Sequence, residues 1–158
     1  MIHLECKPDV ALLKKLTGLG RKGINHAGSK SEVVKGVEKE NKALGLVDQD
    51  PFAIQPKAMN NYQPYRSLDQ AEIKVLKRGD KFLIILCPRL EEWIIKAARE
   101  VEIDIKNYGL PQSGEKLHEE INNRLDKFER LLGDIQEAPR IEELKKILKS
   151  FLDGIPHP

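Results

Sequence analysis

The apolar positions along the chain follow two periodicities, and each periodicity predicts a different kind of element. Short apolar runs predict buried strands at residues 2–4, 43–47 and 82–86, and a weaker run predicts a strand at 24–27. Apolar side chains spaced three and four residues apart predict helices over residues 8–19, 29–37 and 90–101. This alternation of strands and helices predicts an α/β fold, with a mostly parallel four-stranded sheet that helices cover on both faces.

Two further patterns predict an added strand in this sheet and two helices after it. Residues 73–76 alternate between apolar and polar and are joined to the run at 82–86 by Arg78-Gly79-Asp80, which predicts a hairpin with 73–76 as an added edge strand. Two amphipathic helices are predicted at 117–132 and from Pro139 onward, and their short connection predicts an antiparallel helical hairpin. We therefore expect an α/β domain over residues 1–111, with a helical hairpin over 112–158 packed on it.

Charge and cysteine content narrow the class of protein. The chain of 158 residues carries 27 basic and 25 acidic side chains, so a polyanionic partner would have to be bound by a local cluster of charge. Cys6 and Cys87 lie far apart and have no metal-binding spacing. No signal pattern opens the chain and no apolar run approaches the length of a membrane span. A cytoplasmic location and no membrane partner are expected.

Acidic residues stand where two of the predicted strands end. The run at 43–47 is followed by Asp48 and Asp50, and the first strand is followed by Glu5. The carboxyl ends of parallel strands meet at one rim of a sheet, where ligands bind in open α/β folds. Carboxylates that meet there repel one another unless a proton or a cation lies between them, and oxygen ligands suit Mg²⁺ or Mn²⁺. The alternatives are that Asp48 and Asp50 belong to an Asp-rich turn, and that Glu5 pairs with Lys7 or another basic residue at the surface.

These motifs resemble those of a known family. The sequence ECKPD at residues 5–9, with a later apolar strand that ends in Asp-x-Asp, resembles the TOPRIM domain. Topoisomerases, bacterial primases, recombination mediators and the overcoming-lysogenisation-defect nucleases share this domain. The usual first motif of the family is Glu-Gly-x-x-Asp, so Cys6 stands in place of a glycine that allows close approach of a substrate or backbone.

The resemblance covers residues 1–105 and implies a fold and a set of site residues. The fold is a four-stranded parallel sheet between helices, in which the strand at 82–86 lies beside the first strand. Glu5, Asp48 and Asp50 would hold Mg²⁺ or Mn²⁺, together with Asp9 from the same motif as Glu5. Glu5, Asp48 and Asp50 would also be catalytic residues.

A second motif extends the resemblance to the helix predicted at 90–101. The sequence LEEW at residues 90–93 resembles the Leu-Glu-Asp-Tyr-like helix start of the lysogenisation-defect nucleases. In those proteins a glutamate helps to bind a second metal ion, and Glu91 matches its position. Glu91 is therefore a further candidate catalytic residue. The alternative is that the helix macrodipole favours an acid in any first turn.

Three residues near the same rim are candidates for binding phosphate. Lys30 lies in the first turn of a helix, where free backbone N–H groups favour an anion. His26 ends a predicted strand and could contact phosphate or act as a general base, and Arg89 precedes the helix at 90–101. Each is also a residue type that is common on an ordinary solvated surface.

The residues and the resemblance together predict Mg²⁺-dependent phosphodiester hydrolysis of a nuclease type. The alternative is a non-catalytic TOPRIM-like subunit that binds nucleic acid or regulates a partner protein, which would dock on the C-terminal helices. A phosphoacceptor domain also gathers acids on such a rim, but it requires a lysine after the last core strand, where the chain has Cys87-Pro88-Arg89. Residues 51–70, with three prolines, predict a mobile loop that would lie over the acidic rim as a lid.

Overall fold

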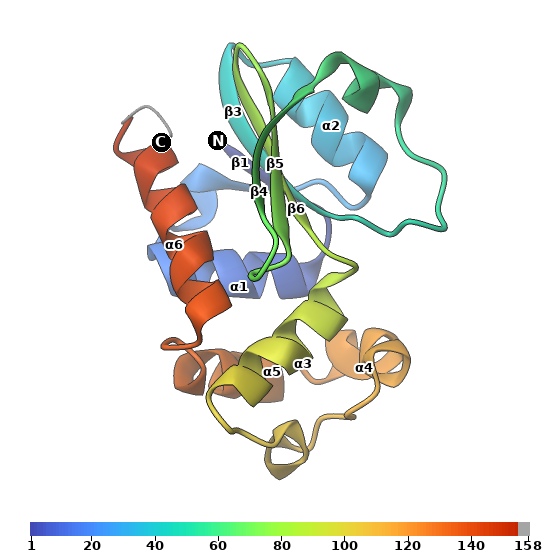
Figure 1. Ribbon diagram of the computed structural model, residues 1–158, viewed down its shortest axis with the longest axis vertical. Coiled ribbons are helices and arrows are strands. Elements are labelled where there is room, and N and C mark those ends of the chain that lie inside the picture. Colours follow the sequence, from blue (N-terminus) through green and yellow to red (C-terminus); the bar gives the residue numbers. More distant parts are fainter. Residues whose placement is uncertain (155–158) are drawn as a thin grey trace.

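The computed structural model describes residues 1–154, and in this part of the chain the strands form one mixed sheet of six (Figure 1). The strands are β1 (Ile2–Leu4), β2 (Ile24–His26), β3 (Lys42–Asp48), β4 (Gln63–Leu68), β5 (Ile73–Arg78) and β6 (Asp80–Leu86). Their order in the sheet is β2-β1-β3-β6-β5-β4. The first four in this order pair in parallel, whereas β5 and β4 are antiparallel to their neighbours. The predicted α/β class is confirmed.

The pairing of β6 differs from the expectation. β6 lies beside β3, in a register that runs from Lys42 opposite Asp80 to Asp48 opposite Leu86. The prediction that the strand at 82–86 lies beside the first strand is therefore wrong. The reason is that both edges of the short strand β1 are taken, one by β2 and the other by β3.

The edge of the sheet beyond β6 also differs from the expectation. β5, predicted as the edge strand, is an inner strand because β4 pairs along its outer side. The prediction of one loop over residues 51–70 is wrong in its second part, which forms a 3₁₀ turn, η2 (Lys57–Asn61), and then β4. This strand was not predicted because Pro64 lacks the backbone N–H that pairs one strand with the next. Proline is tolerated in an edge strand, and here the register of β4 with β5 shifts between Pro64 and Arg66.

The helices of the described chain are α1 (Lys7–Thr17), α2 (Lys30–Glu38), α3 (Leu90–Glu100), α4 (Gly114–Glu120), α5 (Leu125–Asp134) and α6 (Pro139–Leu152). Short 3₁₀ turns occur at η1 (Arg21–Gly23), η3 (Ile105–Tyr108) and η4 (Ile121–Asn123). α1 has Pro8 in its first turn and ends at Gly18, whose φ of 71° is the left-handed conformation of a helix C-cap. α2 begins at Ser29, whose side chain accepts a hydrogen bond from the backbone N–H of Glu32.

Side chains alternate across the sheet and divide the core into two layers. Ala43 and Val47 of β3 pack with the valines of α2, and Leu44 and Leu46 pack in the larger cluster on the opposite face. The larger cluster contains buried residues of α1, α3, α4, α5 and α6. Figure 1 shows α2 and α6 on opposite sides of the sheet, with α1, α3, α4 and α5 below its lower end. Helices thus cover both faces, which buries the parallel strands.

The C-terminal helices differ in detail from the expected hairpin. The helix predicted over 117–132 is interrupted by η4 and by Arg124, which has non-helical dihedral angles (φ −134°, ψ 33°). Two adjacent asparagines at 122–123, which are poor helix formers, account for the break. α5 and α6 each pack on α1, and α6 also packs on α3. The last four residues of the expected 112–158 segment lie outside the described residues.

Within residues 1–154, no helix is both long enough and apolar enough to span a membrane.

Candidate functional site

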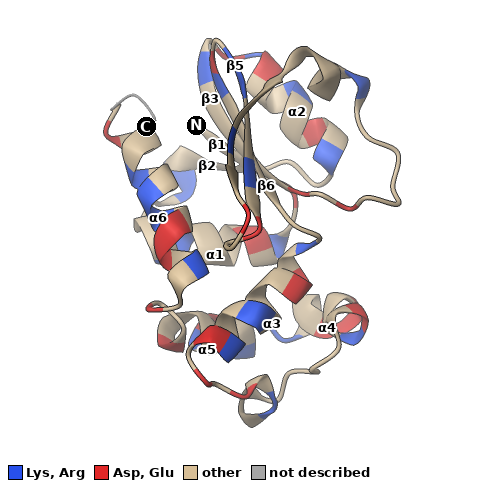
Figure 2. Cartoon of the chain, in the orientation of Figure 1, with Lys and Arg blue, Asp and Glu red and all other residues tan. Residues whose placement is uncertain are grey.

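Four acidic side chains come together where β1 and β3 end. Glu5 follows β1, Asp48 ends β3, Asp9 lies in the first turn of α1 and Glu91 in the first turn of α3. We call these four residues the carboxylate cluster. They are close enough for the charges of Asp9, Glu5 and Glu91 to raise the pKa of Asp48. Figure 2 shows acidic positions at the end of β3 and in the first turns of α1 and α3.

Asp48 joins β3 to the start of α3. Its Oδ1 accepts a hydrogen bond of 2.9 Å from the backbone N–H of Leu90, so this side chain satisfies one of the free donors at the start of α3. Burial raises the pKa of Asp48 to about 9, and the neighbouring carboxylates add to the shift, whereas the bond from Leu90 opposes it. Without a cation, Asp48 is therefore protonated at neutral pH.

Asp9 is the most deeply buried member of the cluster. Asp9 is 2 % exposed, and its Oδ1 has no hydrogen-bond partner. Its Oδ2 accepts a bond of 3.1 Å from the Cys6 thiol, so this cysteine holds the acid. Burial raises the pKa of Asp9 to about 7, and the charges of Glu5 and Glu91 add to the effect. Burial also raises the pKa of Cys6, which keeps the thiol protonated as a donor.

Glu5 is the member of the cluster on which the charge of a lysine acts most strongly. Its Oε1 is buried and has no hydrogen-bond partner. Burial raises the pKa of Glu5, whereas a hydrogen bond from the backbone of Asp48 and the charge of Lys30 lower it. The Lys30 ammonium is held at the rim because it donates a bond of 3.0 Å to the carbonyl of Gln49 and another to the side chain of Gln55. Burial lowers the pKa of Lys30, against the effect of Glu5 and the two aspartates.

Glu91 has a partner that sequence reasoning missed. Glu91 is 4 % exposed, and its Oε1 lies 2.5 Å from Nδ1 of His118 on α4. The two residues are 27 positions apart, in different helices. No spacing or motif in the sequence relates them, because their contact depends on how α4 packs against α3.

Asp50 and Arg89 lie beside the four residues of the cluster. Asp50 has a positive φ of 42°, and its backbone N–H donates to the carbonyl of Pro88 at 2.8 Å. Its charge is close enough to raise the pKa of Glu5. The guanidinium of Arg89 binds the carboxylate of Glu92, with Nε 3.1 Å from Oε2. Arg89 therefore already has an anionic partner, which a phosphate group would have to replace.

His26 lies on the same rim but away from the cluster. It ends β2, next to Leu4 of β1, and is exposed. Together with Asn25 and the buried His3, His26 lines a separate cavity of ≈ 390 Å³. The structure therefore does not bring His26 into contact with the carboxylates.

The segment after Asp50 is a turn held by side-chain hydrogen bonds rather than a long lid. The side-chain amide of Gln55 donates to the carbonyls of Gln49, Asp50 and Ala53. Residues 57–62 then turn back and pack with α2, where Ala58, Met59 and Tyr62 join the smaller core cluster. Figure 1 shows the segment leaving the rim and running alongside α2. The prediction of a lid that extends to residue 70 is wrong, because residues 57–61 form η2 and residues 63–68 form β4.

The donor atoms of the cluster fit a hard divalent cation. All are carboxylate oxygens, and Glu5 Oε1 and Asp9 Oδ1 are buried without a partner. No group of three or more His, Cys, Asp or Glu side chains in residues 1–154 is already arranged to hold a metal ion. Oxygens of Asp48, Asp9 and Glu91 are instead bonded to Leu90, Cys6 and His118. Binding would require these side chains to turn toward the ion.

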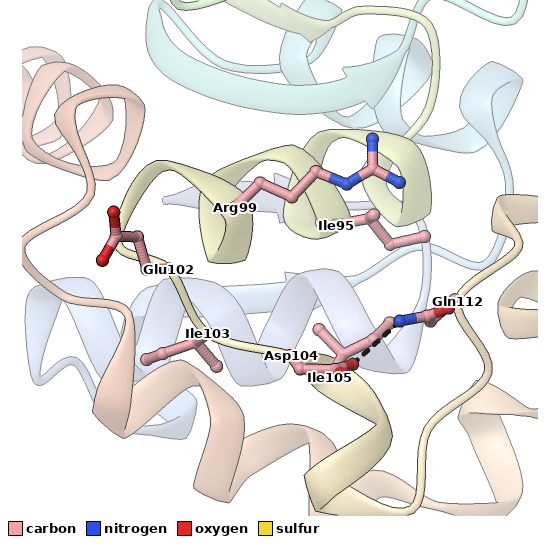
Figure 3. A pocket seen from close by; sticks show the side chains of 7 residues that line it. All are labelled: Ile95, Arg99, Glu102, Ile103, Asp104, Ile105 and Gln112. Carbon is pink, nitrogen blue, oxygen red and sulfur yellow. Dashed lines mark hydrogen bonds between the residues drawn. The ribbon is translucent and has the colours of Figure 1, made fainter.

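A further cavity, of ≈ 290 Å³, lies beside α3 beyond its first turn. Figure 3 shows that Asp104 and Gln112 face each other there, joined by a hydrogen bond of 2.9 Å. The Asp104 carboxylate also accepts a bond from the backbone N–H of Lys106. Because these polar groups already have partners, the cavity is a weaker candidate site than the carboxylate cluster.

The resemblance to the TOPRIM domain rests on the acids that follow β1 and end β3, and on the first turn of α3. Glu5, Asp48 and Glu91 of that pattern are brought together, and Asp50 stands beside them. Comparison of the chain with protein-family models, with curated proteins and with solved structures finds no match.

Proposed function

We propose that this protein hydrolyses phosphodiester bonds in nucleic acid, with Mg²⁺ or Mn²⁺ bound at the carboxylate cluster. The observation that carries the proposal is the pair of buried carboxylate oxygens without partners, Glu5 Oε1 and Asp9 Oδ1. Buried polar atoms are normally hydrogen-bonded, and carboxylates in close contact require a proton or a cation. A divalent cation would satisfy both oxygens and remove the mutual repulsion.

The arrangement of the strands supports a TOPRIM-like site. Four parallel strands, β2, β1, β3 and β6, are adjacent, with the glutamate after β1 and the Asp-x-Asp pair at the end of β3. Glu5 and Asp48 therefore lie at the same edge of neighbouring strands. The resemblance implies this combination of sheet and acids, although β6 lies beside β3 rather than beside β1.

Five residues near the rim have roles in this proposal. Glu5, Asp48 and Asp50 would hold the cation, with Asp9 behind them. A bound ion of this kind supplies positive charge to a phosphate group and a water molecule of lowered pKa. The Lys30 ammonium, held by the Gln49 carbonyl, would place a further positive charge beside the phosphate. These groups would orient the phosphodiester and balance the negative charge that develops on it.

One observation favours a non-catalytic alternative. The Cys6 thiol occupies an oxygen of Asp9 at the position where the TOPRIM motif has glycine. In the alternative, the chain binds nucleic acid or regulates a partner protein without cutting. A partner could not use the apolar sides of the C-terminal helices, because residues such as Phe128 and Leu144 are fully buried. It would have to bind their charged outer sides.

Cleavage assays separate the two functions. Labelled single-stranded DNA, duplex DNA and RNA would be incubated with the protein in Mg²⁺, Mn²⁺ or EDTA. We expect cleavage of at least one substrate with metal and none in EDTA. Glu5→Gln and Asp48→Asn should abolish it, whereas Asp80→Asn, an exposed acid at the opposite end of β6, should not. Cleavage that survives Glu5→Gln would contradict the proposal, and metal-dependent binding without cleavage would favour the alternative.

A further inference from the structure

We propose that the turn after Asp50 binds single-stranded nucleic acid, with Phe52 stacked on a base, Ile54 packed beside it and Lys57 next to a phosphate. This inference rests on the proposed function only in that the ligand is nucleic acid, and it names the strand type. It requires neither a bound cation nor cleavage.

Phe52 and Ile54 are more exposed than any other large apolar residue in the part of the chain from 1 to 154. Their exposed fractions are 100 % and 98 %, whereas those of Met1 and Leu152 are 50 % and 41 %. A single exposed apolar side chain is ordinary, but two of them two residues apart form a patch that points to a ligand. Figure 1 shows the segment between β3 and η2, in teal, running out from the sheet.

Hydrogen bonds hold the turn so that Phe52 stands at its tip. The backbone N–H of Ala53 donates to the carbonyl of Asp50 at 3.0 Å, and the ring of Pro51 restricts φ at the second position of this turn. The side-chain amide of Gln55 donates to the carbonyls of Asp50 and Ala53, at 3.1 Å each. An aromatic side chain on a turn fixed in this way loses little conformational entropy when it binds a ligand.

Two lysines place positive charge beside the turn. The Lys30 ammonium donates a hydrogen bond to the side chain of Gln55, which also holds the turn. Lys57 is exposed and forms no ion pair with any residue from 1 to 154. The negative charge of Asp50 acts on both Lys30 and Arg89 and is therefore partly offset. Exposed apolar side chains next to cations match the bases and phosphates of a single strand.

The size and place of the patch favour a nucleic acid over other partners. A stable dimer buries about 800 Å² on each partner, and two side chains on a turn supply only a small part of that area. The turn leaves directly from the carboxyl end of β3, where ligands of α/β sheets bind. In a duplex the bases already stack on one another, so Phe52 would reach a base face only in a single strand.

Fluorescence anisotropy of the full chain with a labelled single-stranded oligonucleotide, in EDTA, tests the proposal. We expect Phe52→Ala to weaken binding by about 5-fold to 140-fold, the range for the loss of one stacked base. Phe52→Trp should bind at least as tightly as the wild type. Phe52→Leu, which keeps an apolar side chain but has no ring, should be nearly as weak as Phe52→Ala. A duplex of the same sequence should bind the wild type more weakly than the single strand does.

The matched control for the apolar contact is Leu152→Ala. Leu152 is an exposed apolar residue of α6, which lies on the opposite side of the sheet from α2, and its loss should leave the affinity unchanged (Figure 1). Because Phe52 is fully exposed, its variants should melt at the temperature of the wild type. A loss of binding by these variants would therefore not come from unfolding.

A salt titration tests the phosphate contact of Lys57. For Lys57→Gln, the slope of log affinity against log salt concentration should fall in magnitude by about 0.7, the value for one phosphate contact to a single strand. Lys149→Gln, which changes an exposed lysine of α6, is the control and should keep the slope of the wild type. An unchanged slope for Lys57→Gln would contradict the contact.

The outcomes separate this inference from the proposed function. If the wild type binds the oligonucleotide and Phe52→Ala binds it equally well, the stacking is refuted while the proposed function stands. If Phe52→Leu binds as the wild type does, the contact is not stacking and the inference fails. Binding that depends on Phe52, without cleavage in Mg²⁺ or Mn²⁺, would support the inference and contradict the proposed hydrolysis.

A lipid surface is the other partner that two apolar side chains beside lysines could meet. Sedimentation with vesicles of phosphatidylserine and phosphatidylcholine provides this comparison. If the wild type binds the vesicles through Phe52 and does not bind the oligonucleotide, the turn belongs to a membrane contact and the inference is overturned.

Discussion

Asp48 and Asp9 are acids whose protonation near neutral pH is controlled by burial. The pKa of Asp48 is raised to about 9 and that of Asp9 to about 7, in both cases chiefly because the charged form would be poorly solvated. An aspartate in the unfolded chain has a pKa of about 3.9. At a pH between the pKa of the unfolded chain and the raised pKa values of the folded protein, the folded protein binds more protons than the unfolded chain. Its stability therefore falls as the pH rises through this range.

The first prediction follows from this difference in pKa. In EDTA, the wild type should lose stability from about pH 5 to about pH 9, and Asp48→Asn should lose less. Asparagine resembles the protonated acid and keeps an oxygen that accepts from the N–H of Leu90. Thermal melts across this pH range measure the effect, with Asp48→Ala as the variant that also loses the hydrogen bond.

A wild type that becomes more stable as the pH rises over this range would contradict the burial of protonated acids. Equal slopes for the wild type and Asp48→Asn would show that Asp48 is already ionised in the folded protein.

The sequence was sufficient to predict that some residues of the candidate site lie together, but not others. Glu5 and Asp48 could be found because they follow apolar strands, and parallel strands end at the same rim. His118 and Cys6 could not be assigned their partners in the same way. The contact of His118 depends on how distant helices pack, and the cysteine is recognisable only as a departure from a motif.

At the scale of elements, the close packing of α2 on β3 helps to set the position of the rim. Gly45, in the middle of β3, allows this approach: an added Cβ would lie 2.8 Å from Cγ1 of Val33 and 2.9 Å from Cδ2 of Leu83. Both distances are shorter than ordinary contacts, and the neighbours are fully buried. A larger residue would therefore push α2, and Lys30 with it, away from the sheet.

We predict that Gly45→Ala lowers the free energy of unfolding by about 1–3 kcal/mol through overpacking. Gly20→Ala is the matched control, because a Cβ there meets nothing within 4 Å and its φ of −89° suits alanine. Urea denaturation of both variants provides the comparison. Equal stability of Gly45→Ala and the wild type would show that α2 is not held against β3 as described.

Element types were more predictable than element pairing. The helices at 90–101 and from Pro139 and the strands at 43–47 and 82–86 have strong patterns, and each forms within a few residues of its expected bounds. β4 could not be predicted because Pro64 and its polar neighbours do not alternate as a strand does. The position of β6 beside β3 depends on long-range pairing, for which the local sequence carries little signal.

For the whole molecule, one large core joins the sheet to the C-terminal helices. Phe128 of α5 is fully buried in the same cluster as Leu46 of β3 and Trp93 of α3. The segment after residue 111 therefore helps to stabilise the sheet and the rim. This packing explains how a residue of α4 reaches the carboxylate cluster.

We predict that Phe128→Ala lowers the free energy of unfolding by about 3–5 kcal/mol, in a single transition that includes the sheet. Phe52→Ala is the control, because Phe52 is 100 % exposed and its loss should change stability little. Denaturation would be followed by circular dichroism and by hydrogen exchange of the β3 amides. If the helices of the Phe128 variant melt while the β3 amides stay protected, the C-terminal segment is an independent unit.

The central claim is that Glu5, Asp48 and Asp50 share a divalent cation, and diffraction from crystals soaked in Mn²⁺ tests it most directly. The account predicts an anomalous peak within about 2–2.5 Å of carboxylate oxygens from these residues. The same peak should be absent from Asp48→Asn crystals. No anomalous density near these carboxylates at millimolar Mn²⁺, in crystals of the wild type, would contradict the account.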